Sequence, residues 1–589
     1  MNNKSFKFSW LNNFMNKGLK NLIFLYFGFV IVKVILAYYI PSSKTLADDY
    51  NYLKMSESFF YHFSLKVHDN FNGQFLPLYP ILISLAQIFK DNNLIYIGIK
   101  VINSLSSSLI IFPAYYLSKE FLLEKKSLLT AIVVSLLPGN FALVSYIMAE
   151  NLFYTLFLFS IYFIYLSFKD KNSKYYLLMI LFSLLTLFTK IQGLILIPLI
   201  LILIFYKTRK EKFNLRFMPL IILILITIIF LLIYFKNIID LIYTNEILAL
   251  MKSKGIILAF IIKIISYIGF LLLSSFILMI PLIISFKIKN IKLNLLRKIS
   301  LITVLISIFL AANHGIYSKR YFYDINGITI VGGRIIGRYV DFVLPLITIL
   351  GFIGLDYYFR NKNKFKKYLK IVKLILILIM IISTSILLNQ LVPFNNISLT
   401  LFGVLKYFIN LIFYSRSSFE FGINLASYLI ISSIFILFPI ITFYLLNKLD
   451  YRKFISLLII FFIVNGLISF GVVYYAASTS WYYNSEQRQI ALYLNEIDSK
   501  RSIVLIDERD NGDLVDAGKY DTTPGRNEKA LYGGSGKNLY TILGYWLNDE
   551  LIIGNVNNLK NVDYVISTYK LNLEKIYETK NNIYLYKVH

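Results

Sequence analysis

Stretches of roughly 20 apolar residues alternate with short polar segments along most of the chain. An α-helix of that length crosses the hydrocarbon core of a lipid bilayer. The pattern predicts thirteen membrane-spanning helices, near residues 20–40, 94–117, 127–147, 150–168, 175–189, 191–206, 216–235, 256–286, 298–313, 338–359, 370–392, 421–447 and 454–475. The two short spans that meet at Thr189 could instead be one broken helix, and residues 77–90 could add a half-span.

The pattern changes in the last part of the chain. This part is polar overall, and its apolar runs are short and strand-like: Ser502–Asp507, Val562–Ser567 and Ile583–Val588. The polar, glycine-containing stretch between Asp507 and Ala530 is typical of a long loop. About 110 residues suffice for an independent core. The sequence therefore predicts a transmembrane domain over residues 1–475 and a small α/β domain over residues 476–589.

Composition supports the membrane assignment. Hydrophobic residues make up 57% of the 589 residues and the mean hydropathy is +0.66, while charged residues reach only 16%. Soluble globular chains carry roughly 25% charged residues, so soluble, disordered and fibrous proteins are excluded. Because the chain has no cysteine, disulfides, thiolate metal sites and cysteine nucleophiles are excluded as well.

The positive charge of the chain indicates its topology in the membrane. The formal net charge is +28, yet the predicted α/β domain carries 13 Lys and Arg against 15 Asp and Glu. Basic residues concentrate in seven short segments of the transmembrane domain: 1–20, 118–126, 169–174, 207–216, 287–298, 360–370 and 448–453. Cytoplasmic loops are enriched in Lys and Arg. This pattern predicts a multi-pass plasma-membrane protein with a cytoplasmic N-terminus and an extracytoplasmic α/β domain, and no nucleic-acid partner.

An acidic pair stands apart from the other charges. Asp48 and Asp49 follow the first span almost immediately, in the long outer segment 41–93. At the membrane interface one carboxylate can act as a general base while its neighbour orients a partner or binds a divalent cation. Alternatively, both residues belong to a helix N-terminus, where acidic side chains are favourable.

Further ionisable residues are predicted at the same outer level of the membrane. Glu150 begins the fourth span, Lys190 lies at the outer turn between the fifth and sixth spans, and Lys100 lies near the outer end of the second span. Ionisable groups in a bilayer are costly unless they are paired or face a wet cavity. Several of them at one depth indicate a cavity for an anionic headgroup, although a single lysine could simply reach outward to the lipid headgroups.

A glycine- and arginine-containing segment leads into the tenth span. It places Arg334, Arg338, Tyr339 and Asp341 at the predicted outer surface. The guanidinium group suits phosphate, because it forms two parallel hydrogen bonds. An Arg338–Asp341 ion pair at a helix start is an equally good interpretation. The four histidines show no metal-ligand spacing beyond His62 with His68, so no metal site is predicted from the residues.

The order of these features resembles the GT-C superfamily of integral membrane glycosyltransferases, in particular the branch of protein mannosyltransferases and aminoarabinose transferases. The resemblance rests on short segments: Ala47-Asp-Asp-Tyr50, Phe75-Leu-Pro-Leu-Tyr-Pro80, Pro138 to Glu150, Thr189-Lys-Ile-Gln-Gly193 followed by Pro198, and Gly337-Arg-Tyr339. The Trp-Trp-Asp-Tyr-Gly signature of oligosaccharyltransferases is absent from the sequence.

This resemblance implies transfer of a sugar from a polyprenyl-phosphate-linked donor to a lipid, glycan or protein acceptor at the outer face of the membrane. Asp48 would be the general base and Asp49 the second acid of the motif. Glu150 and Lys190 would line the donor site, with Lys190 standing where arginine is common in the family. The remaining candidates for binding the donor phosphate are Arg338, Arg334, Lys100 and Tyr339.

Two other functions also fit the sequence. A transporter or flippase of polyprenyl-linked glycans would need a cationic cavity too, and an enzyme like O-antigen ligases or polymerases would also act on a lipid-linked sugar. Neither the dependence on a divalent cation nor the identity of the sugar follows from the sequence.

Overall fold

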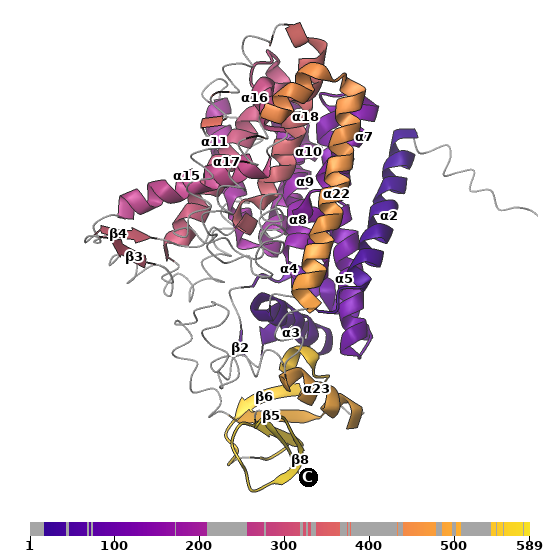
Figure 1. Ribbon diagram of the computed structural model, residues 1–589, viewed down its shortest axis with the longest axis vertical. Helices are drawn as coiled ribbons and strands as arrows, with labels where there is room; N and C mark the ends of the chain where they lie inside the picture. The colour runs from indigo at the N-terminus through magenta and orange to yellow at the C-terminus, as the bar shows by residue number, and fades with distance from the viewer. Residues whose placement is uncertain are drawn as a thin grey trace, which may run out of the picture.

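The helices of the chain form a membrane bundle with a small sheet domain at one end (Figure 1). The computed structural model describes residues 17–42, 46–67, 70–71, 75–170, 172–208, 256–275, 278–317, 322–325, 328–331, 337–363, 365, 374, 377–378, 433, 437, 440–478, 486–497, 502–507, 543–548, 550–557, 559–580 and 582–588. Within these residues, six helices are long and apolar enough to cross a membrane, and a bent pair of helices makes seven. The protein is a multi-pass membrane protein.

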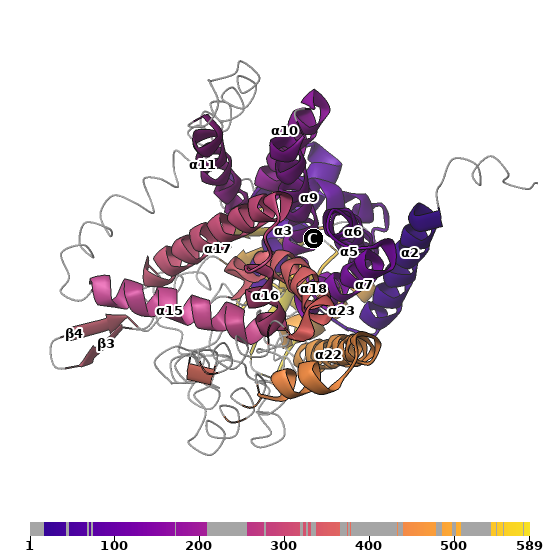
Figure 2. The ribbon, with the colours of Figure 1, turned by 90° about the horizontal axis from the view of Figure 1, so that it is seen from above.

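Helices α9 (Glu150–Lys169) and α18 (Leu344–Arg360) lie in the middle of the bundle (Figure 2). In their spans, 78% and 89% of the residues are buried, whereas α2 (Lys17–Tyr38) lies at the edge with 22% buried. Exposed side chains such as Phe24 and Ile31 give α2 an apolar outer surface that suits lipid. Other helices of the bundle are α5 (Asn92–Ser108), α6 (Ile111–Lys119), α7 (Glu124–Ser135), α10 (Ser173–Thr189), α11 (Leu196–Thr208), α15 (Ile256–Ser274), α16 (Met279–Ser285), α17 (Ile291–Tyr317) and α22 (Tyr451–Ser478).

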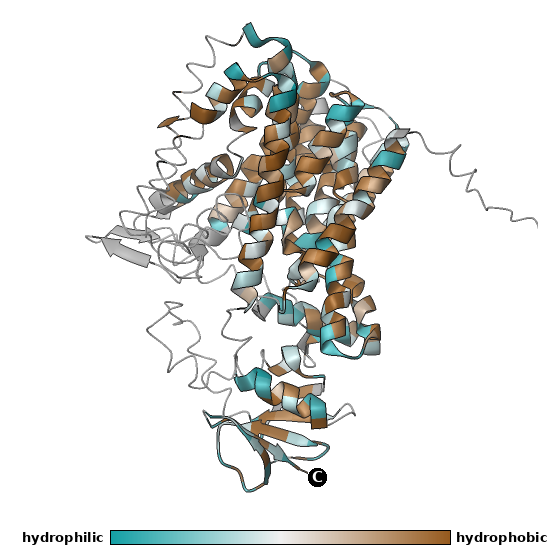
Figure 3. Cartoon of the chain, turned by 45° about the vertical axis from the view of Figure 1, so that its right-hand side comes forward, coloured by the Kyte–Doolittle hydropathy of each residue, from teal (hydrophilic) through white to brown (hydrophobic). Residues whose placement is uncertain are grey.

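Hydrophobic residues predominate along the length of the bundle, and hydrophilic residues gather toward its ends (Figure 3). At the end away from the sheet domain, Lys169 pairs with Glu120 at 2.6 Å, and Lys126 pairs with Asp356. Glu120, Lys126 and Lys169 come from segments that the sequence predicted to be basic cytoplasmic loops, and Asp356 lies four residues before another such segment, 360–370. Their common location fits that prediction, while the orientation of the termini in the membrane stays a prediction.

The predicted span 127–147 is sharply bent. Helix α7 and the segment Pro138–Ser145 meet at an angle of 75°. Pro138 is the first residue of the short helix α8 (Pro138–Phe141), and a proline has no N–H group with which to continue the preceding helix. The bend leaves a partly irregular segment directly before Glu150.

The predicted span 256–286 is likewise divided, into α15 and α16. The two helices that meet at Thr189 are also separate, because Lys190 has an extended backbone between α10 and the 3-10 helix η3 (Ile191–Ile195). Residues 77–90 form the short helices α4 (Leu78–Ile83) and η1 (Ser84–Ile88). Apart from single residues, the predicted spans 216–235 and 370–392 and most of 421–447 lie outside the described residues, so the number thirteen stays a prediction.

Close packing between α16 and α18 depends on Gly354. A Cβ atom on Gly354 would overlap the carbonyl oxygen of Pro281 in α16. Small residues let helices approach closely in membranes. We expect Gly354→Ala to cost about 1–3 kcal/mol of stability, measured as a lower thermal unfolding midpoint in detergent. Gly28→Ala is the control, because a Cβ there meets no atom within 4 Å; equal midpoints for the two variants would contradict this packing.

The C-terminal part forms the predicted α/β fold. Its five-stranded sheet has the order β6-β5-β7-β9-β8, with β5 parallel to β6 and β7, and with β9 antiparallel to β7 and β8. The elements are α23 (Glu486–Ile497), β5 (Ile503–Asp507), β6 (Glu550–Gly554), β7 (Tyr564–Ser567), β8 (Glu574–Glu578) and β9 (Tyr584–Lys587). The three strands predicted from the sequence are therefore confirmed to within two residues at each end.

Helix α3 (Leu46–His62) lies between the bundle and this α/β domain (Figure 1). It follows α2 in the chain and packs against α4 and η1. Two short hairpins complete the described structure: β1 (Lys66–Val67) with β2 (Asn70–Phe71), and β3 (Phe322–Ile325) with β4 (Ile328–Val331). The acidic pair of the sequence is thus placed where the membrane domain meets the α/β domain.

Candidate active site

The acidic pair lies in the first turn of α3. Both carboxylates are therefore near a helix N-terminus, as the alternative interpretation of the pair predicted. Neighbouring residues on a helix point about 100° apart, and the two side chains have different surroundings. The Asp48 side chain is 28% exposed, whereas Asp49 is fully buried. Only Asp48 is accessible in this arrangement.

Arg338 connects Asp48 to the membrane bundle. It lies in the 3-10 helix η6 (Gly337–Tyr339), shortly before α18. Its Nη1 atom donates a hydrogen bond to Asp48 Oδ2 at 2.7 Å and lies 3.9 Å from Glu150 Oε1. Although burial lowers the pKa of Arg338, the nearby Asp48 and Glu150 carboxylates raise it overall, so the group stays cationic. The alternative Arg338–Asp341 pair is not among the ion pairs of the described residues.

Lys190 also contacts Glu150. Helix α10 ends at Thr189, and the extended backbone of Lys190 turns its side chain toward the start of α9. There its Nζ atom forms an ion pair with Glu150 Oε1. Glu150 is the first residue of α9 and is only 1% exposed. A buried carboxylate needs such partners, because burying a lone charge is costly.

Asp48, Glu150, Lys190 and Arg338 together form one site, which we call the charge cluster. Up to 290 residues separate its members in the sequence, and each member lies in the first turn of a helix or next to the end of one. The two carboxylates and two cations balance in formal charge. The sequence predicted all four as site residues, and the structure brings them into direct contact.

Buried polar side chains hold the irregular segment that precedes Glu150. The amide groups of Asn103 and Asn151 donate hydrogen bonds to carbonyl oxygens within residues 143–148, at 2.9–3.1 Å. The hydroxyl of Tyr79 donates to Asn103 Oδ1 at 3.0 Å. None of these three was predicted as a site residue. Asparagines within apolar spans are a usable signal, because polar groups in a membrane are retained where they have partners.

Asp341 and Tyr154 are two further residues beside the cluster that the sequence interpretation did not assign to the site. Both are buried, and both interact electrostatically with Glu150. Among the described residues, Asp341 Oδ1, Tyr154 Oη and Glu150 Oε2 have no hydrogen-bond partner. Buried polar atoms without partners are uncommon and often mark a place for water or a ligand.

The other predicted site residues have different places. Tyr339 flanks the cluster, with its ring 5.7 Å from Arg338 Cζ. Lys100 instead donates a hydrogen bond to the Ile40 carbonyl at 2.6 Å and lies 3.9 Å from the ring of Tyr96, so its contacts tie α5 to the end of α2. Arg334 lies outside the described residues. In the part of the chain that the structure describes, no group of three His, Asp or Glu residues is arranged to hold a metal ion.

Comparisons with known proteins agree with this architecture. The family model of dolichyl-phosphate-mannose-protein mannosyltransferase matches residues 77–235. The fold is similar to that of ArnT from Cupriavidus metallidurans in the apo state, with a TM-score of 0.55, 10% identity, and coverage of 97% of this chain and 98% of ArnT. The structure of the same ArnT bound to undecaprenyl phosphate gives a TM-score of 0.54, 10% identity, and coverage of 96% and 97%. No curated protein sequence matches the chain.

The family match over residues 77–235 and the ArnT-like fold support the resemblance to the GT-C superfamily of integral membrane glycosyltransferases that the sequence motifs indicated. The similarity of fold to ArnT extends over nearly the whole length of both chains.

Proposed function

We propose that the protein transfers a sugar from a polyprenyl-phosphate-linked donor to an acceptor hydroxyl or amine at the membrane surface. The observation that carries this proposal is the charge cluster at one end of the membrane bundle. It joins the partly exposed carboxylate of Asp48 to two cations, Lys190 and Arg338, whose side chains are only 13% and 15% exposed. The ArnT structure with undecaprenyl phosphate supports a lipid-linked donor.

Lys190 and Arg338 are the proposed ligands of the donor phosphate. In the cluster, both cations are already neutralised by Glu150 and Asp48. A phosphate that binds to them competes with these carboxylates, and charge-assisted hydrogen bonds are strong enough to make the exchange. Donor binding would therefore free Asp48 from Arg338 and make its carboxylate available as a base.

Asp48 is the proposed general base. The acceptor oxygen or nitrogen attacks the anomeric carbon of the sugar and passes its proton to Asp48, while the bond from that carbon to the phosphate oxygen breaks. The leaving polyprenyl phosphate keeps the bonding electrons, and Lys190 and Arg338 stabilise the charge that develops on it. We assign this role to Asp48 rather than Asp49 because Asp49 is fully buried.

The experiment that tests the proposal uses purified protein in liposomes with undecaprenyl-phosphate-linked sugars and a panel of lipid, glycan and peptide acceptors. We expect labelled sugar to appear on an acceptor together with free undecaprenyl monophosphate. Movement of the intact donor across the vesicle without cleavage would instead show a flippase. An enzyme that uses diphosphate-linked donors would leave these sugars uncleaved and would release undecaprenyl diphosphate from a diphosphate-linked sugar supplied in a parallel assay. Either of these results would overturn the proposal.

A further inference from the structure

The α/β domain packs directly against the helix that carries Asp48. A short segment of this domain, residues 543–548, which we call the interface turn, forms one helical turn and then contacts the bundle. Leu543 and Leu547 in it are at most 1% exposed. They share one hydrophobic core with Tyr52 and Leu53 of α3 and with Ala149, the residue before Glu150. The core beneath the charge cluster is thus built jointly by both domains.

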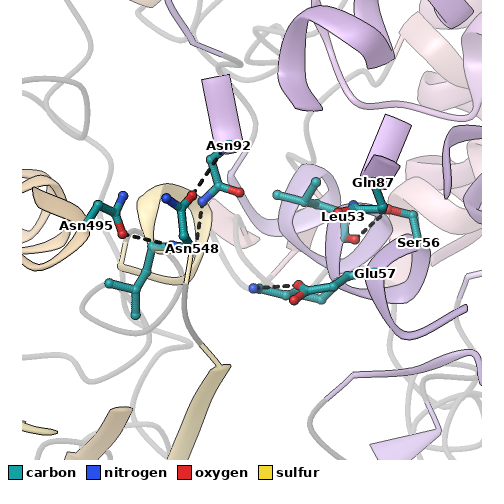
Figure 4. Close-up of polar contacts among 9 residues, drawn as sticks. Leu53, Ser56, Glu57, Gln87, Asn92, Asn495 and Asn548 are labelled. Carbon is teal, nitrogen blue, oxygen red and sulfur yellow. Dashed lines mark hydrogen bonds and ion pairs between the residues drawn. The ribbon is translucent and has the colours of Figure 1, made fainter. Parts of the chain in front are cut away.

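Three asparagines fasten the interface turn to the bundle (Figure 4). Asn92, the first residue of α5, donates its side-chain amide to the Leu547 carbonyl at 2.7 Å, and its backbone N–H donates to Asn548 Oδ1 at 3.2 Å. The backbone N–H of Asn548 in turn donates to Asn495 Oδ1 of α23 at 3.0 Å. This chain of hydrogen bonds links the α/β domain to the membrane helix α5 and restricts the orientation of the domain relative to the bundle.

Gly544 brings the interface turn into contact with α3 itself. A Cβ atom on Gly544 would lie 2.6 Å from Cε2 and 2.8 Å from the hydroxyl of Tyr50. Tyr50 is 2% exposed and stands two residues after Asp48 in the same helix. The ring of Tyr50 therefore rests on the backbone of the α/β domain, where only a glycine leaves room for it.

We propose that the docked α/β domain positions Asp48, with Gly544 and Asn548 as positioning residues, an inference that rests on the proposed function. Helix α3 is rigid over one turn, so a displacement of Tyr50 also moves Asp48 relative to Arg338 and to a bound donor. A misplacement of about 1 Å can cost 10²-fold in rate. The domain thereby sets the position of the Asp48 carboxylate relative to the acceptor, while the positions of Lys190 and Glu150 are set by the bundle.

The test compares Gly544→Ala and Asn548→Ala with Asn557→Ala, a substitution of an exposed asparagine in the same domain. Turnover and KM for an undecaprenyl-phosphate-linked sugar are measured together with hydrogen exchange of the peptide 46–62. We expect Gly544→Ala to lower kcat about 10- to 100-fold with KM for the donor changed less than about threefold, and to raise exchange in α3. Asn548→Ala should act in the same direction, and Asn557→Ala should match the wild type.

Each outcome bears on the proposal separately from the proposed function. If exchange in α3 rises in both variants and kcat does not change, the domain does not position the base. If both variants match the wild type in exchange and kcat, the contact does not constrain α3, and the proposal is overturned. If the wild-type protein releases no polyprenyl phosphate at all, the proposed function fails. Hydrogen exchange in α3 then still shows whether the docked α/β domain stabilises this helix.

Discussion

Replacing Asp48 with asparagine is expected to reduce sugar transfer about 10²- to 10⁴-fold, the usual contribution of a general base. The amide has nearly the same shape as the carboxylate, and its oxygen can still accept the hydrogen bond that Arg338 donates at 2.7 Å. What is lost is the group that takes the proton of the acceptor. We therefore expect the turnover of the purified protein to fall while its affinity for the donor is retained.

Asp49→Asn is the matched control for this substitution. Asp49 is fully buried, so it cannot meet the acceptor in this arrangement, and its replacement should reduce turnover less than that of Asp48. Thermal unfolding of both variants shows whether either substitution disturbs the fold. Wild-type turnover by a correctly folded Asp48→Asn protein would refute the assignment of the base.

Removing the Lys190 side chain is expected to lower turnover about 10²- to 10³-fold, as loss of a group that stabilises developing charge usually does. In Lys190→Ala, the leaving phosphate loses one of its two proposed cations, and Glu150, 1% exposed, loses the nearer of its two ion-pair partners. We therefore expect weaker donor binding as well as slower transfer. Kinetics with an undecaprenyl-phosphate-linked sugar measure both effects.

The variant Lys190→Arg tests whether activity depends on the positive charge at position 190 or on the shape of the lysine side chain. Glu150 Oε2 has no hydrogen-bond partner among the described residues, so the arginine fork can engage both carboxylate oxygens. This variant should keep most of the activity. Lys174→Ala, at the exposed opposite end of α10, should leave turnover unchanged. An alanine at position 190 that transfers sugar at the wild-type rate would remove Lys190 from the donor site.

The sequence was informative about the site because span ends alternate between the two sides of a membrane. Once the basic loops were placed on one side, the start of the fourth span and the turn after the fifth fell on the other, which brought Glu150 and Lys190 to one level. The same argument grouped Lys100 with them. Depth in the membrane does not say which face of a helix a residue occupies, and Lys100 faces the end of α2.

By itself, the sequence determined the membrane class and the strands of the C-terminal domain, because these follow from local apolar patterns. It also predicted the four charged residues that meet in the cluster as candidates, because charge in a bilayer is costly. Only the tertiary structure decided the partners: Arg338 pairs with Asp48 and not with Asp341, three residues away. It also decided that Pro138 bends the third span and that Gly544 meets Tyr50. These contacts join residues up to hundreds of positions apart, and helix packing, which no local pattern encodes, sets which of them meet.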